Sequence, residues 1–304
     1  MRASSERVAL AAFLAQSVLA GGNAVGVRFS NRELDPLWGA ALRFLLAALA
    51  LGLIAAVLRV PLPRGRALAG ALLYGAVTFG AAFGLIYVAL VELHAGFGQI
   101  LFGLVPLATL LLAAAQGQER LRPSALAGAV VALAGVALMS RAPLEESVPA
   151  LSLAAALGAV ACFAQGAVVV RRFPPVHPAM ANALGMATGA VLLLALALPT
   201  GSSLALPRAG ETWLAVGYLV VVGSLVFALY VLVLHRWEAS RTAFGFVLTP
   251  VVTVLLSAWL DDEPLTAGLL AGGALVLGGV YLGAVRRPRR GGVYASSGRG
   301  IDGP

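Results

Sequence analysis

A few polar side chains interrupt the long apolar runs of this sequence, and they are the groups that could bind a solute. Gln16 and Asn23 are seven residues apart, so on a helix they share one face. Their amides could hold both ends of a zwitterion, or they could hydrogen-bond to neighbouring helices. Arg43 is the only charged residue inside an apolar run. Its guanidinium could attract a substrate carboxylate or phosphate, or it could extend to the membrane surface and bond to helix-end carbonyls.

The other candidate substrate-binding residues are uncharged and lie in further apolar runs: Gln99, Gln165, Tyr74 and Tyr218. Polar groups in the hydrocarbon region of a membrane are costly, so they tend to face a cavity or a partner. Hydrogen bonding between helices is the alternative for the amides. Tyr74 and Tyr218 occupy equivalent positions in a repeat described below, so a shared packing role is the alternative for these two residues.

Two prolines, Pro106 and Pro250, also lie inside apolar runs and at equivalent positions. A proline within a helix frees a backbone carbonyl and can kink the helix. We expect the two residues to form a pair of gating kinks, and static kinks are the alternative.

The sequence lacks the residues that several kinds of chemistry require. No Asp or Glu lies inside an apolar run, and buried carboxylates are the usual proton carriers of coupled transporters. There is no phosphate-binding Gly-Lys-Ser/Thr loop, no His/Cys/Asp/Glu group with metal-ligand spacing, and no Ser/His/Asp set in the apolar runs. The sequence therefore predicts a protein without enzymatic activity, without a cofactor and without a metal site.

The composition is typical of a protein that crosses a lipid bilayer many times. The chain has 304 residues, 60% hydrophobic and 11% charged, and its mean hydropathy is +0.94. Each apolar run is near the ~20 residues that span a bilayer as a helix. The ten runs cover residues 8–27, 37–58, 68–90, 96–116, 124–140, 150–170, 178–198, 212–234, 242–260 and 266–285.

The chain contains an internal repeat. An offset of 144 positions places residues 104–138 on residues 248–282 without a gap, with Pro106 on Pro250 and Gly135 on Gly279. Agreement of this length indicates a duplicated structural unit. Each copy has an apolar helix with a proline, a short acidic turn and a second apolar helix with several glycines.

The repeat predicts how the chain is organised. Residues 8–140 form a first five-helix repeat, residues 150–285 form a second, and residues 286–304 form a disordered cytoplasmic tail rich in Arg, Gly and Ser. Because five is an odd number, the second repeat must be inverted relative to the first. The predicted fold is therefore an all-α integral membrane protein with ten transmembrane helices in two inverted repeats, an arrangement found in alternating-access transporters.

The arginines predict the orientation of the chain in the membrane. Most lie at the termini or in the loops after the second, fourth, sixth and eighth runs, whereas the opposite loops hold only Arg28, Arg32, Arg141 and Arg208. The positive-inside rule then places both termini in the cytoplasm. The net charge of +8 resides in these loops and the tail, so no nucleic-acid partner is expected.

Short motifs in both halves resemble the EamA-type unit of the drug/metabolite transporter superfamily. The first half has Gly21-Gly22-Asn23, Ala41-Leu42-Arg43-Phe44, and Gly117-Gln118-Glu119-Arg120-Leu121 followed by Gly128 and Gly135-Val136. The second half has Asp262-Glu263-Pro264-Leu265 followed by Gly272 and Gly279-Val280. The resemblance covers about residues 8–285. The sequence departs from the family pattern at Ala20, where Trp is usual, and at Arg28, where Lys is usual.

The resemblance implies a secondary transporter that exports small polar metabolites such as amino acids by alternating access. It also implies a central cavity lined by the first four helices of each repeat, with the fifth helix of each at the periphery. The alternative substrates are sugar conjugates or other organic solutes of the same superfamily, and a second alternative is a non-transporting membrane receptor or scaffold. The expected partners are a small-molecule substrate and the lipid bilayer. The expected location is the bacterial cytoplasmic (inner) membrane, as a monomer or a homodimer.

Overall fold

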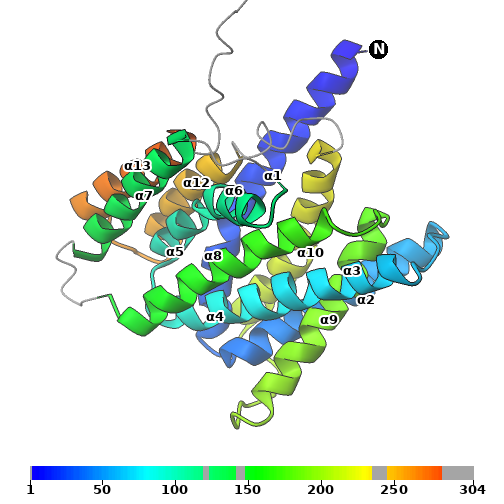
Figure 1. Ribbon diagram of the computed structural model, residues 1–304. Coiled ribbons are helices and arrows are strands. Elements are labelled where there is room, and N and C mark those ends of the chain that lie inside the picture. The colour runs from blue at the N-terminus through cyan, green and yellow to red at the C-terminus, as the bar shows by residue number, and fades with distance from the viewer. Residues whose placement is uncertain (1, 119–122, 142–147, 235–244, 283–304) are drawn as a thin grey trace, which may run out of the picture.

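The computed structural model describes residues 2–118, 123–141, 148–234 and 245–282, and within these ranges the chain forms helices joined by turns (Figure 1). The predicted all-helical character is therefore confirmed for this part of the chain. Glu119 of the first acidic turn and the predicted disordered tail at 286–304 lie outside the described residues.

The first half of the chain forms eight helical elements. They are α1 (Arg2–Asn31), α2 (Pro36–Val57), α3 (Arg66–Tyr74), η1 (Gly75–Ala82), α4 (Phe83–Glu92), α5 (Ala95–Phe102), α6 (Val105–Ala115) and α7 (Pro123–Arg141). The described part of the second half forms α8 (Ala150–Val170), α9 (Pro178–Ala197), α10 (Gly210–Leu234), α12 (Gly245–Leu260) and α13 (Ala267–Val280).

Within the described residues, seven helical stretches are long and apolar enough to cross a membrane, and three shorter apolar helices accompany them. The shorter ones lie in α7, α12 and α13 and correspond to the fifth, ninth and tenth predicted runs. Several membrane-spanning helices are thus present, whereas the count of ten and the inversion of the second repeat stay predictions.

The first residues of several helices explain why those helices begin where they do. Pro36 and Pro178 open α2 and α9, where a missing N–H costs little because the first N–H groups of a helix have no intrahelical acceptor. Thr266 precedes α13, and its hydroxyl accepts the backbone N–H of Leu269 at 3.1 Å.

Two of the predicted spans are irregular. The span at residues 95–115 is divided into α5 and α6 by a turn at Gly103 and Leu104, and Pro106 lies in the first turn of α6. Its repeat equivalent, Pro250, lies inside the continuous helix α12. The third span passes from α3 through the π-helical η1 into α4. Pro106 therefore marks a break between two helices, and the gating role of the two prolines stays a prediction.

Helix α1 packs closely against two helices of the second half, α10 and α12. A Cβ atom added at Gly21 would lie 2.5 Å from Val252, and one at Gly26 would lie 3.1 Å from Leu219. The Thr253 hydroxyl donates to the Gly21 carbonyl at 2.7 Å. Small residues allow this approach of two backbones, and in a bilayer such packing is a main source of helix association.

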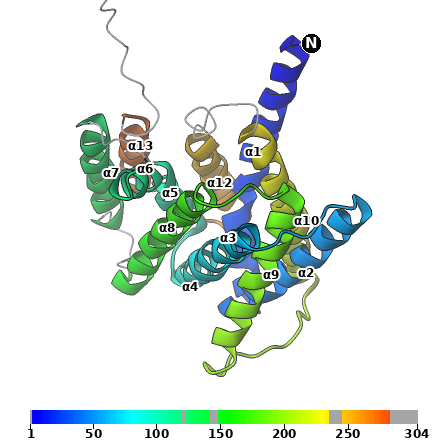
Figure 2. The same ribbon diagram turned by 45° about the vertical axis from the view of Figure 1, so that its right-hand side comes forward.

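The last helices of the two halves, α7 and α13, lie side by side at one edge of the molecule (Figures 1 and 2). Their contacts are reciprocal. A Cβ on Gly135 would lie 2.6 Å from the Gly272 carbonyl oxygen, and a Cβ on Gly279 would lie 2.5 Å from the Gly128 carbonyl oxygen. Gly135 and Gly279 are equivalent in the repeat, as are Gly128 and Gly272. The repeated glycines therefore serve one close helix–helix contact from both sides.

This contact predicts different effects at two neighbouring glycines. We expect Gly279→Ala to lower the free energy of unfolding by about 1–3 kcal/mol, because the new methyl group meets the backbone of α7, which cannot move without separating the helices. Gly278→Ala is the matched control, since a Cβ at Gly278 meets nothing within 4 Å. Thermal unfolding of the purified protein in detergent measures both variants. Equal midpoints for the two variants would contradict the close contact.

Candidate functional site

The side chain of Arg43 lies at the centre of the candidate site. It extends from α2, is only 2% exposed, and donates from Nη2 to the Asn23 Oδ1 atom on α1 at 3.1 Å. Its Cζ atom lies 5.0 Å from the ring centroid of Phe44 and 5.2 Å from that of Phe83, within the range of cation–π attraction. On the side of α10, a Cβ at Gly223 would lie 2.8 Å from Nη2. The guanidinium is therefore enclosed by helices of both halves of the chain.

The positive charge of Arg43 is not balanced by a neighbouring carboxylate. Among the residues that the structure describes, no carboxylate oxygen lies within the 4.0 Å ion-pair distance of its nitrogens. Its Nη1 atom is buried and has no hydrogen-bond partner. The fully buried Tyr87 hydroxyl on α4 interacts with this charge but also lacks a hydrogen-bond partner. Donors left unpaired in a buried place are costly, so this arrangement indicates a place for an acceptor.

Of the predicted site residues, Asn23 and Arg43 are brought together. Tyr218 lies beside them on α10, where it donates to the Leu19 carbonyl at 2.6 Å and interacts electrostatically with Arg43. Gln16 is buried on α1, as expected for a residue on the packed part of this helix.

The remaining predicted residues lie apart from Arg43 or make other contacts. Gln165 on α8 accepts from the Gln116 amide at the end of α6, at 2.7 Å. Tyr74 packs edge-on against Phe79, with ring centroids 5.4 Å apart. Gln99 is half-buried on α5. The sequence analysis gave interhelical hydrogen bonding and packing as alternatives to substrate binding, and the contacts of Gln165 and Tyr74 are of these two kinds. The substrate-binding roles of all seven residues stay predictions.

Two residues of the site, Tyr87 and Gly223, are absent from the set of binding residues predicted from the sequence. Tyr87 follows Phe83 by four residues, so the two share a helix face, and both reach Arg43. This spacing was a usable signal for Tyr87. Gly223 gives no signal in the sequence, because only the packing of α10 on α2 shows that a side chain there would displace the guanidinium.

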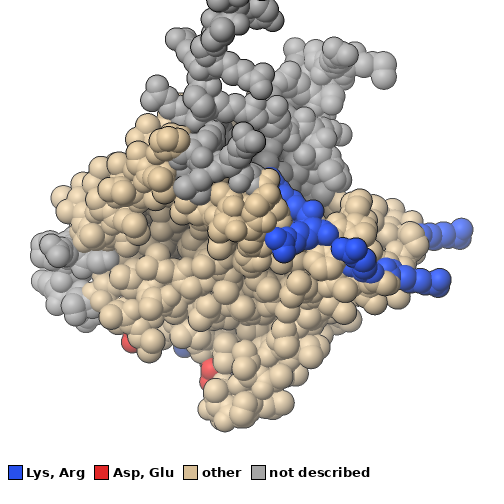
Figure 3. All heavy atoms as spheres, viewed as in Figure 1, with Lys and Arg blue, Asp and Glu red and all other residues tan. Residues whose placement is uncertain are grey.

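Charged side chains are distributed unevenly over the surface. In Figure 3 most of the visible arginine atoms gather at the upper right, and the visible acidic atoms lie along the lower edge. The exposed arginines of the described chain include Arg59, Arg64 and Arg66 after α2 and Arg171 and Arg172 after α8. The orientation of the two ends in the membrane stays a prediction from the loop arginines.

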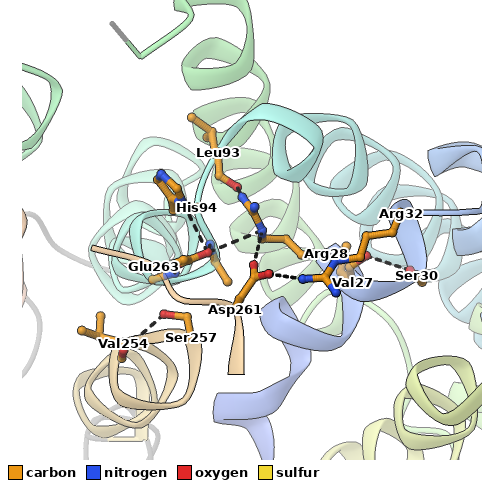
Figure 4. A network of polar contacts seen from close by, with 12 residues as sticks. Val27, Arg28, Ser30, Arg32, Leu93, His94, Val254, Ser257, Asp261 and Glu263 are labelled. Carbon is orange, nitrogen blue, oxygen red and sulfur yellow. Dashed lines mark hydrogen bonds and ion pairs between the residues drawn. The ribbon is translucent and has the colours of Figure 1, made fainter. Parts of the chain in front are cut away.

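A cluster of ion pairs joins the two halves at the predicted external end, and we call Arg28, Arg32, His94, Asp261 and Glu263 the Glu263 cluster (Figure 4). Arg28 Nε lies 2.8 Å from Asp261 Oδ2 and 3.5 Å from Glu263 Oε1, and Arg32 also pairs with Asp261. Arg28 donates in addition to the Leu93 carbonyl at 2.7 Å. The cluster therefore ties the end of α1 and the α4–α5 turn to the turn between α12 and α13.

Glu263 has the most buried carboxylate of this cluster, with 3% of its side chain exposed. It accepts from the backbone N–H groups of Ala95 at 2.5 Å and Gly96 at 3.1 Å, at the beginning of α5, and His94 Nδ1 lies 3.5 Å away. Burial acts to raise the pKa of this carboxyl, but the neighbouring His94, the two backbone N–H groups and Ser257 outweigh burial and lower the pKa below 4.5. Glu263 therefore serves as a charged cap on α5.

The lowered pKa predicts how stability depends on pH. A carboxyl with a lowered pKa in the folded state stabilises the fold above its unfolded-state pKa, and this contribution is lost as the pH falls through the folded-state value. We expect Glu263→Gln to lower the free energy of unfolding by about 1–3 kcal/mol at pH 7. The difference from the wild type should shrink as the pH falls below 4.5.

Unfolding of the detergent-solubilised protein, followed from pH 7 down to about pH 3 so that the scan extends well below the ordinary glutamate pKa, checks this expectation. Glu211→Gln is the control, because Glu211 is an exposed glutamate at the beginning of α10. A wild-type advantage over Glu263→Gln that persists unchanged at low pH would refute the role given to the ionised carboxylate.

Comparison with known proteins gives a family match and a similar fold. The sequence profile of the EamA-like transporter family matches the chain twice, at residues 7–141 and 150–284. A crystal structure described only as that of a protein shares the fold, with a TM-score of 0.64 and 21% identity over 93% of this chain and 96% of that one.

Three relatives illustrate what similar proteins are called. The "Uncharacterized inner membrane transporter YedA" of Escherichia coli K12 is 27% identical over 84% of this chain and 83% of its own length. The "Probable amino-acid metabolite efflux pump" of Salmonella typhimurium is 29% identical over 90% and 95%. The "Probable terminal-alkyne amino-acid exporter" of Streptantibioticus cattleyicolor is 30% identical over 79% and 81%.

Proposed function

The chain belongs to the EamA-like transporter family, and from this premise we propose that it exports small polar metabolites such as amino acids by alternating access. The resemblance inferred from the short sequence motifs is confirmed by the two profile matches. The protein is a multi-pass transporter of the inner membrane, as the names of its relatives and its apolar helices indicate. The solute, the direction and the mechanism belong to the proposal.

The observation that carries the proposal is the unbalanced charge of Arg43 between the two halves of the chain. A buried guanidinium with an unpaired nitrogen is a place where a polar solute can gain an interaction that the protein alone does not provide. Asn23, which accepts a hydrogen bond from Arg43, offers an amide for a second polar group of the solute. Two relatives are named as an efflux pump and an exporter, and these names support export as the direction of transport.

Alternating access is supported by the Glu263 cluster, which joins the two halves at one end of the bundle. In the proposed cycle the cluster holds the external end closed while Arg43 receives solute from the cytoplasm. The pairs then separate as the two halves rearrange and the solute leaves on the outside. The proposal includes ten helices in two inverted repeats with both termini in the cytoplasm, because an inverted pair gives two equivalent end states.

The proposed cycle does not depend on a carboxylate that carries protons across the membrane. The acidic residues of the described spans lie at span ends: Glu211 is in the first turn of α10, and Glu92 is the last residue of α4 and accepts a hydrogen bond from Ser152. A carrier driven by the solute gradient or by the membrane potential fits this distribution of charge.

Solute flux tests the proposal directly. Purified protein in liposomes should move members of a panel of amino acids and related metabolites without ATP, faster than protein-free liposomes do. The panel should be run with an imposed pH gradient at clamped potential as well, and uphill movement driven by the pH gradient and lost in Glu92→Gln would contradict the absence of a proton relay. If no solute of a broad panel moved above the background, the transporter activity proposed for this chain would be wrong.

Reporter fusions test the orientation. At a fusion point after residue 304, a reporter that works only in the cytoplasm should be active. At a fusion point after Ser203, between α9 and α10, a reporter that works only outside the cytoplasm should be active. The two fusions control for each other, because they are expected to give opposite results in the same cells. A C-terminal reporter that is active outside the cell would exclude the proposed topology.

A further inference from the structure

The charge balance around Arg43 restricts the solutes that can bind there. The carboxylates of Asp261 and Glu263 are nearly buried, but they are held in the Glu263 cluster by Arg28 and its neighbours. In the described part of the chain, Arg43 forms no ion pair with any carboxylate. The site therefore carries a net positive charge, which attracts an anion and repels the ammonium group of a zwitterion.

The unpaired groups of the site are hydrogen-bond donors. Arg43 Nη1 and the Tyr87 hydroxyl are buried without partners, and the guanidinium interacts electrostatically with that hydroxyl. A carboxylate has two acceptor oxygens and no donor, so it matches a pair made of a guanidinium nitrogen and a hydroxyl. A phenolic hydroxyl forms a stronger hydrogen bond with a charged acceptor than with a neutral one, and this also favours an ionised solute.

An aromatic cluster from α2, η1, α4 and α10 adjoins Arg43 through Phe44 and Phe83. The ring of Phe44 lies 5.2 Å from that of Phe79 and 4.9 Å from that of Phe83, and Phe79 lies 5.3 Å from Phe227 on α10. Offset and edge-on packing of rings at these distances is favourable, so an aromatic or bulky apolar group can join the cluster by the same contacts.

Resting on the transporter function proposed above, we propose that the substrate is an organic monoanion, a carboxylate with an aromatic or bulky apolar body. Arg43 and Tyr87 hold its carboxylate, and the Phe44–Phe79–Phe83–Phe227 cluster holds its body. Among amino-acid derivatives, those whose amine is uncharged, as in an N-acyl amino acid, bind more tightly than the parent zwitterions. Tyr87 is thereby a specificity-determining residue of this carrier.

A monoanionic substrate also supplies the driving force for export without proton coupling. Each cycle moves one negative charge from an interior that is negative to the exterior. A membrane potential of about 100 mV acting on one charge sustains a gradient of roughly 50-fold at equilibrium. No acidic residue in the membrane is required for this coupling, in agreement with the position of Glu92 at the end of α4.

Binding of three matched probes to the purified full-length protein tests the substrate class. N-acetylphenylalanine is an anion, N-acetylphenylalaninamide is its neutral isostere, and phenylalanine is a zwitterion with the same ring. We expect the anion to bind at least 10-fold more tightly than either of the others. N-acetylglycine, which has the charge without the ring, should bind about 10-fold more weakly than N-acetylphenylalanine. In liposomes, efflux of N-acetylphenylalanine should quicken with a potential that is negative inside, set with potassium and valinomycin.

Two substitutions separate a role in binding from a role in folding. Tyr87→Phe removes a buried hydroxyl that makes no hydrogen bond of normal geometry within the protein, so the thermal midpoint should not fall, whereas affinity for N-acetylphenylalanine should fall about 5- to 10-fold. Affinity for the neutral amide should change little. Arg43→Lys keeps the charge but loses the planar fork, so preference for the anion should weaken without vanishing. Tyr281→Phe on the edge of the bundle is the control, and it should bind all probes like the wild type.

The outcomes distinguish this inference from the function on which it rests. If phenylalanine binds as tightly as N-acetylphenylalanine, or if Tyr87→Phe binds the anion with unchanged affinity, the anion site is refuted while transport of other solutes stands. If none of the probes binds, the monoanion class is wrong, and flux of the wider metabolite panel decides separately whether the chain is a transporter. Potential-independent efflux of the anion would refute the coupling to membrane potential.

Discussion

The close approach of α1 to α10 and α12 is the contact on which the rest of the structure depends. Gly21 and Gly26 leave no room for side chains between these helices, and the Thr253 hydroxyl adds a hydrogen bond to the α1 backbone. In a bilayer there is little hydrophobic gain in joining two apolar helices, so close packing and hydrogen bonds must supply the association. Because α1 belongs to the first half and its partners to the second, this contact fixes the two halves relative to each other.

That position allows one helix to serve two sites of different character. Near its middle, α1 presents Asn23 to Arg43, and at its end it presents Arg28 to Asp261 and Glu263. In the Glu263 cluster every charge meets an opposite charge or a backbone group, which makes the cluster a stable closure of one end. At Arg43 the described neighbours are aromatic rings, an amide and two tyrosine side chains, and Nη1 has no hydrogen-bond partner, so the protein leaves an interaction open for a solute. Paired charges hold the fold, and the unpaired charge offers binding.

This division of roles links the structure to transport. A carrier needs contacts that can separate during the cycle, and ion pairs at a wet membrane surface lose less on separation than ion pairs in hydrocarbon. The Glu263 cluster lies at the ends of helices and in the turns that follow them, where Arg28 and Arg32 keep 23% and 51% of their side chains exposed. In the peripheral contact of α7 with α13, Gly135 and Gly279 lie closest to backbone atoms of the facing helix, and no charged side chain is among their nearest neighbours. It is suited to hold the two halves together while the central helices rearrange.

The sequence by itself determined the membrane class, the helical segments, the internal repeat and the family resemblance, because each depends on local composition or on a regular spacing along the chain. It also selected Asn23 and Arg43, since a polar group in an apolar run is visible without a structure. Only the tertiary structure decided that Tyr87 joins Arg43 and that Gln165 bonds to Gln116. It also paired Arg28 with Asp261, 233 positions apart. Such contacts depend on how helices rotate and cross, and the sequence of one chain, uniformly apolar on most helix faces, does not specify that geometry.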